Sequence, residues 1–333
     1  MEAFVLTRYG GPDAMEMRRV TDPVAAAGEV LVEVRAAGLN PVDYKLRDGK
    51  MRLFTRLPLP MVAGSEVSGV VAAVGPGVTR FSVGEKVYAR VDKTKLGAFA
   101  PLAAVAEPFV AAMPESLNFV DAAGLPLAGL TALQALRDEL AVKPGQRIFI
   151  SGGAGGVGTL AIQLAAWMGA EVATTASPRS EEFLRSLGAT TVINYRERKF
   201  KDVLKNYDGA LDLTGGQDLL DSFTILNPGA KTVSIAGMPE PTTARVDLGA
   251  GLPLAAAFWL ASAGIRRRAR QCGVGYRYLF MHPSGADLQV LAGLVDGGQL
   301  VPVTDKVFPF GEIAGAFGYL EQGHAKGKVV VRL

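Results

Sequence analysis

The chain has 333 residues, of which 49% are hydrophobic and 20% charged, and its formal net charge of +3 is too small to suggest a nucleic-acid partner. Its single cysteine, Cys272, excludes an internal disulfide and is consistent with a reducing compartment. The N-terminus, MEAFVLTRYGGPD, lacks a basic segment followed by an apolar core, so we expect no secretory signal and a cytoplasmic location.

Residues 1–122 are predicted to form a compact, mostly β, barrel-like domain. The segments 29–35 and 69–75 alternate or run apolar as half-buried strands do, and Pro76-Gly77 and Val83-Gly84 are turn signals. Several short strands at such spacing indicate a domain of this kind.

From residue 123 the pattern changes to alternating strands and helices. Strands are predicted at 147–151, 171–176, 191–195, 209–214, 230–236 and 276–281, with helical segments between the first five and a longer insertion before the sixth. Six strands with helical crossovers make an α/β, doubly wound parallel sheet of the Rossmann type, whose ligand lies at the carboxyl ends of the strands. A helix at 287–295 and a strand at 328–333 follow.

A glycine-rich turn, SGGAGGVG (151–158), joins the first of these strands to a helix. Gly153, Gly155 and Gly158 have the G-x-G-x-x-G spacing of a dinucleotide site. The first permits a tight turn, the second lets backbone approach a pyrophosphate, and the third packs the helix on the strand. We therefore expect cofactor phosphates to contact this segment, including Gly156 and Val157, at the helix N-terminus.

The insertion contains an apolar stretch, 252–261 (LPLAAAFWLA), followed by a basic run at 266–270 (RRRAR). The stretch is too short to span a bilayer. Two interpretations remain: an interfacial membrane helix, or a helix with one buried face and a solvated basic end. The second is favoured.

These motifs resemble the medium-chain dehydrogenase/reductase superfamily, in its zinc-independent quinone oxidoreductase branch. The resemblance runs nearly end to end and rests on GLNPVDYKLRDG (38–49), GSEVSGVVAAVGPGV (64–78), FSVGEKVYA (81–89), LPLAGLTAL (125–133), SGGAGGVG and GHAKGKVVV (323–331). It implies a GroES-like catalytic domain formed by residues 1–122 and 283–333, a nucleotide-binding domain at 123–282, and a homodimer.

A zinc site is not expected. Zinc-dependent relatives often carry a G-H-E segment, which reads Gly64-Ser65-Glu66 here. The two histidines, His282 and His324, and Cys272 would all have to converge to supply three ligands, which their spacing does not suggest. Glu66 is predicted to be a buried or turn carboxylate bonded to nearby backbone or arginine.

The second strand favours NADP(H) over NAD(H) as cofactor. NAD-binding sheets usually end this strand with an acid that bonds the ribose 2′-hydroxyl, but here Thr175-Ala176 leads into Ser177, Pro178 and Arg179. Ser177 and Arg179 can bond a 2′-phosphate that a carboxylate would repel. The resemblance adds Tyr195, in an I-N-Y stretch, to this site.

Further cofactor contacts are implied only by the resemblance. They are Thr131, the segment from Ser234 to Gly237, Phe280 and Met281 at the end of the sixth strand, and Lys328. For Phe280 and Met281 core packing is the alternative, and for Lys328 the alternative is a surface lysine.

The resemblance also implies the reaction, hydride transfer from NADPH to a quinone or an α,β-unsaturated carbonyl. The stretch 40–45 (NPVDYK) is read as a proline-stiffened loop lining the substrate cleft. Asn40 and Tyr44 are predicted to bond cofactor or substrate, Lys45 to steady the ribose or the developing oxyanion, and Asp43 to orient the loop. The alternatives are an enoyl-thioester reductase and a non-catalytic NADPH-binding redox sensor or structural protein.

Overall fold

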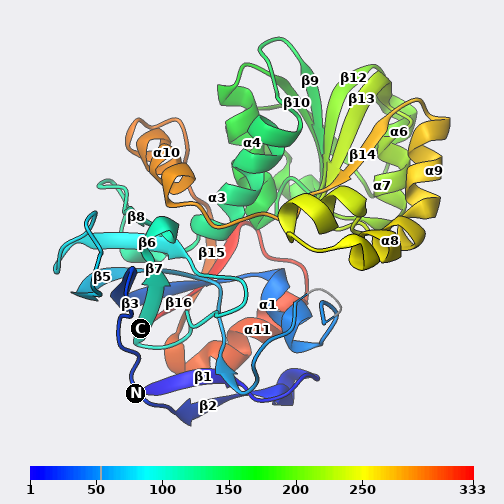
Figure 1. The fold of residues 1–333 in the computed structure, drawn as a ribbon. Coiled ribbons are helices and arrows are strands. Elements are labelled where there is room, and N and C mark those ends of the chain that lie inside the picture. Colours follow the sequence, from blue (N-terminus) through cyan, green and yellow to red (C-terminus); the bar gives the residue numbers. More distant parts are fainter. Residues whose placement is uncertain (53–54) are drawn as a thin grey trace. The chain divides into compact units, whose positions relative to one another are not determined.

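The computed structural model describes residues 1–52 and 55–333, which form two compact units (Figure 1). One unit contains Met1–Leu130 and Pro283–Leu333, and the other contains Thr131–His282. The chain passes from the first unit to the second after residue 130, whereas the sequence placed this boundary after residue 122. It returns to the first unit after residue 282.

The unit of residues 131–282 is built on one six-stranded sheet. Its strands are β9 (Arg147–Ile150), β10 (Glu171–Ala176), β11 (Ala189–Asn194), β12 (Tyr207–Asp212), β13 (Leu226–Ser234) and β14 (Gly275–Tyr278). Their order is β11-β10-β9-β12-β13-β14 and every pair is parallel. This confirms the predicted doubly wound sheet, and the order reverses between β9 and β12, where such sheets bind their ligands.

Helices cover both faces of this sheet (Figure 1). They include α4 (Gly156–Trp167), α5 (Glu181–Ser186), α6 (Phe200–Val203), α7 (Gly216–Ser222) and α9 (Ala263–Gln271), while α8 (Leu252–Ala261) contacts α9. On one face, Phe149 of β9 and Ala210 of β12 form a core with Phe200 of α6, Leu219 of α7 and Ala269 of α9. Because the central strands are buried on both faces, their middle residues are apolar, as in residues 148–150 of β9, which is why they were readable from the sequence.

Both ends of the chain build the other unit. Its large sheet has the order β15-β16-β3-β5-β6-β8, with β7 also paired to β3. The C-terminal β16 pairs antiparallel with β3, with Val330 opposite Gly38. The strands are β3 (Glu29–Leu39), β5 (Glu66–Val74), β6 (Lys86–Arg90), β7 (Leu102–Ala106), β8 (Val110–Ala112), β15 (Thr304–Pro309) and β16 (Lys328–Arg332).

A small sheet and several helices complete this unit. The small sheet, β2-β1-β4, contains β1 (Glu2–Leu6), β2 (Met15–Arg19) and β4 (Met61–Val62). The helices are α1 (Pro41–Arg47), α2 (Phe119–Ala123), α10 (Gly285–Asp296) and α11 (Ile313–Glu321), while α3 (Pro126–Leu133) crosses the boundary between the units.

Candidate functional site

The glycine-rich turn lies at the carboxyl end of β9, where the strand order reverses. Gly152 has a φ of +65°, in the left-handed region, so it makes the tight turn that the sequence analysis assigned to Gly153. Gly153 must be glycine for a different reason, because a Cβ there would lie 2.2 Å from Thr174 Oγ1. A Cβ on Gly158 would lie 2.5 Å from the Gly152 oxygen, so this glycine keeps α4 close to the turn.

The start of α4 suits a pyrophosphate. Its N-cap is Gly155, which has no side chain to accept from the N–H groups of the first turn, at Gly156 and Val157. A Cβ on Gly155 would meet only an ordinary contact, 3.6 Å from the Gly152 oxygen, so packing within the chain does not demand glycine there. A phosphate held against this backbone would demand it.

Ser177, Arg179 and Tyr195 follow the ends of two neighbouring strands. Ala176 of β10 is paired with Asn194 of β11, and the Tyr195 N–H donates to the Ala176 oxygen at 3.3 Å. The side chains of Arg179 and Tyr195 are exposed, and that of Ser177 is half-buried. The pairing of β10 with β11 thus places Ala176 opposite Asn194, although the two residues are 18 positions apart in the chain.

No carboxylate ends β10. The first acid after it, Glu181, lies on α5 and is engaged by Arg185 at 3.0 Å, one turn along the same helix. The site therefore offers a hydroxyl, a guanidinium and a phenol, and this donor set suits a phosphate better than a ribose hydroxyl.

Ser234 and Asp212 form a buried network at the ends of β13 and β12. The Ser234 hydroxyl donates to Asp212 Oδ2 at 2.6 Å and accepts from the N–H of Gly237 at 2.8 Å. Asp212 also accepts from the Gly215 N–H at 2.9 Å and from the Ser151 hydroxyl at 3.2 Å. The Ser234 side chain thus shapes the turn up to Gly237. Asp212 and Ser151 were not predicted as site residues, although a run of polar residues closing three adjacent strands is a signal of this edge.

Phe280 and Met281 lie beyond the sixth strand, which ends at Tyr278, so the predicted extension of that strand to residue 281 is wrong. The Phe280 N–H instead donates to Asp247 Oδ2 at 3.0 Å. The next residue but one, His282, is held by Gln134, whose side chain donates to its oxygen at 2.9 Å and accepts from its N–H at 3.1 Å. Side chains thus replace the sheet ladder for this segment.

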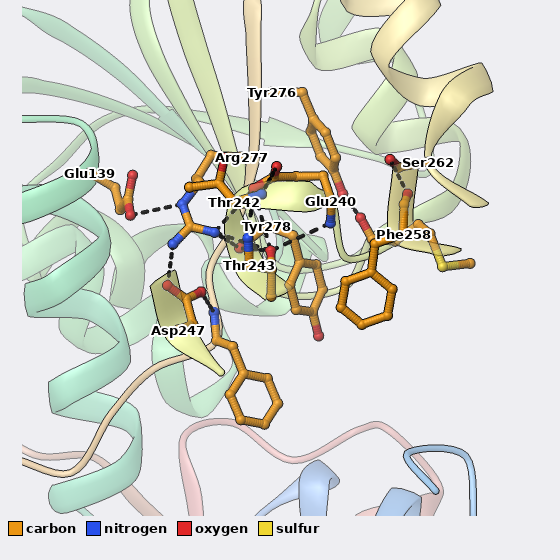
Figure 2. Close-up of polar contacts among 12 residues, drawn as sticks. Glu139, Glu240, Thr242, Thr243, Asp247, Phe258, Ser262, Tyr276, Arg277 and Tyr278 are labelled. Atoms are coloured by element: carbon orange, nitrogen blue, oxygen red, sulfur yellow. Dashed lines mark hydrogen bonds and ion pairs between the residues drawn. The ribbon is translucent and has the colours of Figure 1, made fainter. Parts of the chain in front are cut away.

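Arg277 organises the surroundings of Phe280 (Figure 2). Its guanidinium is buried and forms ion pairs with Glu139, Glu240 and Asp247, the first two at 2.9 and 3.1 Å. Three segments that are distant in sequence therefore meet at the Arg277 guanidinium. Because Asp247 also accepts from the Phe280 N–H, its ion pair with Arg277 fixes the Phe280 backbone as well. A guanidinium can donate to several carboxylates at once through its planar fork of N–H groups, and a lysine ammonium in its place would lack this geometry.

In the other unit, residues 41–47 form the helix α1, so the prediction of a loop is wrong. Asn40 and Asp43 make a reciprocal capping box, in which the Asn40 N–H donates to Asp43 Oδ2 at 2.8 Å, and Pro41 occupies the first turn. These are signals of a helix N-terminus that the sequence itself contains.

Lys328 lies in a buried ionic network with Glu66 and Asn40, so its interpretation as a surface lysine is wrong. Its Nζ lies 2.8 Å from Glu66 Oε1 and 3.0 Å from the Leu39 oxygen, and it also bonds the Asn40 side chain. Asn40 Nδ2 donates to Glu66 Oε1 at 2.7 Å, and the Leu127 N–H donates to Glu66 Oε2 at 2.6 Å. Glu66 is thus the expected buried carboxylate, with lysine in place of arginine.

Tyr44 and Lys45, unlike Asn40, keep their polar ends outside this network. Both side chains are half-buried. Burial, followed by the neighbouring Lys50, lowers the pKa of Lys45, and burial, followed by Glu321, raises that of Tyr44. In the part of the chain that the structure describes, no ion pair engages the Lys45 ammonium. Thr131, in contrast, is buried on α3.

Ser65, which occupies the position of the zinc-binding histidine, is hydrogen-bonded to another side chain of this protein. The Ser65 hydroxyl donates to Asp43, and among the described residues no three His, Cys, Asp or Glu side chains are grouped as metal ligands. We expect the purified protein to carry no stoichiometric zinc and a strong chelator to leave its activity intact, because the ligands are missing. Elemental analysis that finds about one tightly held zinc per chain would contradict this.

Asp43 makes the folding stability of this unit depend on pH. Burial raises the pKa of its carboxyl from 3.8 to about 6, against the opposing hydrogen bonds from Ser65 and Asn40. Since the folded protein holds this proton more tightly than the unfolded chain, its contribution to stability is complete below about pH 4 and is lost as the pH rises through about 6. We expect wild type to lose stability relative to Asp43→Asn over this interval in urea unfolding. Parallel profiles of the two proteins would contradict the assignment.

Comparison with known proteins adds family information. Residues 26–115 match the family "Alcohol dehydrogenase GroES-like domain", and residues 187–331 match "Zinc-binding dehydrogenase". The NADPH-dependent alkenal/one oxidoreductase of Arabidopsis thaliana is 36% identical over 99% of this chain and 79% of its own.

Two solved structures share the whole fold. The quinone oxidoreductase of Coxiella burnetii has a TM-score of 0.86 at 31% identity, covering 100% of this chain and 99% of its own. A mycobacterial protein solved in complex with NADPH has a TM-score of 0.83 at 25% identity, with both chains fully covered.

Proposed function

The chain belongs to the medium-chain dehydrogenase/reductase superfamily, in its zinc-independent quinone oxidoreductase branch, and on that premise we propose how its own residues serve the reaction. The protein is an oxidoreductase of quinones and α,β-unsaturated carbonyls. A reduced nicotinamide, when bound, supplies the hydride. The chain's residues bind that cofactor, orient it and stabilise the charge that develops on the acceptor.

The preferred cofactor is NADP(H). The observation that supports this proposal is that no acid ends β10, while Ser177 and Arg179 follow β10 and Tyr195 follows the neighbouring β11. Arg179 bonds the 2′-phosphate with its planar fork of donors, and Ser177 and Tyr195 add hydroxyl donors. The NADPH bound to the mycobacterial relative is consistent with this choice.

The remaining cofactor contacts divide into backbone and side-chain roles. The turn from Gly153 to Gly158 holds the pyrophosphate through N–H groups. The segment from Ser234 to Gly237, together with Phe280 and Met281, presents backbone to the nicotinamide, and Asp212 and Asp247 hold these two segments in place. We also propose that Thr131 lies near the cofactor.

Lys45 is the electrophilic group of the site. Hydride addition to the β-carbon of an enone, or to a quinone, places negative charge on the carbonyl oxygen. The Lys45 ammonium stabilises that charge or steadies the nicotinamide ribose, and Tyr44 donates a hydrogen bond. Asn40 and Lys328 act through the ionic network with Glu66, which fixes the start of α1.

The experiment that tests this function is a substrate panel. Purified protein is mixed with NADPH and a series of quinones, 2-alkenals and enoyl thioesters, and the loss of NADPH absorbance is followed. We expect turnover of quinones or enones with NADPH in preference to NADH. Turnover of enoyl thioesters alone would identify an enoyl reductase, and NADPH binding without any turnover would identify a redox sensor.

We propose a homodimer and a cytoplasmic location with this function. Cys272 is a free, half-buried thiol, which is compatible with a reducing compartment. Among the described residues no helix is long and apolar enough to cross a membrane.

A further inference from the structure

Helix α8 exposes an apolar face. Leu252, Ala256 and Leu260 follow one another at four-residue spacing, so they form a line along the helix, with Trp259 beside it. Leu252 is 76% exposed, Leu260 69% and Trp259 53%. A helix that is apolar all round normally lies in a protein core or in lipid, but this one has only its opposite side buried, through Ala255 and Phe258.

Helix α9, which follows directly, is strongly cationic. Arg267, Arg268 and Arg270 are exposed, and Ala269 packs on the sheet beneath them. The sequence contains no Asp or Glu at all between Asp247 and Asp287. The cations of α9 therefore have no acid in their own segment to neutralise them.

One residue joins the apolar face to the cations. Arg266 lies over the ring of Trp259, 5.3 Å from its centroid, and its Nη2 donates to the Trp259 oxygen at 2.6 Å. Its Nε also donates to the Ser262 hydroxyl at 3.0 Å, and that hydroxyl donates to the Phe258 oxygen (Figure 2 shows Ser262 and Phe258). The tryptophan is thus held by an arginine at the junction of the two helices.

We propose that this surface, formed by Leu252, Ala256, Trp259, Leu260, Arg267, Arg268 and Arg270 and here called the α8–α9 surface, binds the surface of a bilayer that contains anionic lipids. Leucine and tryptophan enter the boundary between headgroups and acyl chains, and the arginines bond the headgroup phosphates. The inference is independent of the proposed function, because none of these residues is assigned to cofactor or substrate.

Charge complementarity favours a lipid surface over a second copy of the chain. In a symmetric dimer made by this surface, both copies would bring arginines to the contact, and the segment from 248 to 286 brings no acid from either copy to pair with them. An anionic bilayer supplies both the negative charge and the apolar layer.

The test is binding to vesicles by the full-length protein. Vesicles of phosphatidylcholine alone are compared with vesicles that also contain phosphatidylserine, by co-sedimentation at low and high salt. We expect binding to the anionic vesicles only, weakened by salt. The chain has two tryptophans, so Trp167→Phe leaves Trp259 as the sole reporter, and its emission should shift to the blue on binding.

Two variants test the two parts of the surface. Leu252→Glu with Leu260→Glu should lower the partition coefficient about a hundredfold, because two leucines no longer enter the apolar layer. Arg267, Arg268 and Arg270 all changed to Gln should also lower it about a hundredfold, at about 1 kcal/mol per cation. The matched controls are Val24→Glu with Val301→Glu, and Arg8, Arg19 and Arg332 all changed to Gln, which alter exposed residues of the other unit.

The proposal is overturned if wild type does not bind anionic vesicles, if it binds neutral vesicles equally well, or if the controls reduce binding as much as the α8–α9 variants. If instead Leu252→Glu with Leu260→Glu converts a dimer to a monomer in light scattering and vesicle binding is absent, the surface belongs to a second copy of the chain, and the lipid assignment is wrong.

Discussion

Replacement of Lys45 by methionine should lower kcat/KM by about ten- to a thousandfold, the range for removal of one group that stabilises a developing oxyanion. Methionine keeps most of the apolar stem that is half-buried on α1, so the helix should remain folded, and only the charge is lost. Because the ammonium acts mainly in the transition state, the fall should appear in kcat more than in KM. Steady-state kinetics with a quinone and a 2-alkenal measure both constants.

Lys50→Met is the matched control. Lys50 is exposed, follows the same helix and pairs with Asp48 at 2.9 Å, so its loss should change kcat little. Tyr44→Phe should cost less than Lys45→Met, since water can supply the proton. Near-normal turnover by Lys45→Met, with NADPH binding unchanged, would show that Lys45 only extends from the surface into solvent and would leave the site without its electrophile.

Replacement of Arg179 by alanine should weaken NADPH binding by about 1.5–3 kcal/mol, the contribution of a hydrogen bond to a charged group, and should change NADH binding far less. The phosphate that distinguishes the two cofactors is the group that Arg179 is proposed to bond. Dissociation constants for both cofactors, from fluorescence titration or calorimetry, give the comparison directly.

The control for this variant is Arg185→Ala on α5. Arg185 is engaged with Glu181 and with the Thr190 oxygen, so its loss should affect the two cofactors equally. Equal weakening toward NADPH and NADH by Arg179→Ala itself would remove Arg179 from the 2′-phosphate site and leave the cofactor preference without its main support.

The nucleotide-binding sheet was predictable because its signals are local. Strands buried on both faces are apolar runs, as at 148–150, and the glycines at 153, 155 and 158 stand next to the strand and helix that they join. Strand ends were less predictable, since the termination of β14 at Tyr278 depends on Asp247, which replaces the ladder partner of Phe280.

Residues joined over long distances in the chain were not predictable. Lys328 and Asn40 are 288 residues apart, and their buried network with Glu66 exists only because β16 pairs with β3. Arg277 likewise meets Glu139 across 138 residues. The helix α1 is a different case, because its capping box is a local signal, and the loop prediction gave the proline too much weight and the Asn40–Asp43 pair too little.

Transfer of deuterium tests the central claim most directly. Protein treated with a chelator is incubated with a 2-alkenal and NADPH that carries deuterium at its transferable position, and the product is analysed by mass spectrometry and NMR. We expect one deuterium on the β-carbon for each NADPH consumed, at the same rate as untreated protein shows with the same deuterated cofactor. A product without deuterium at that carbon, or activity that disappears with the chelator and returns with zinc, would contradict zinc-independent hydride transfer.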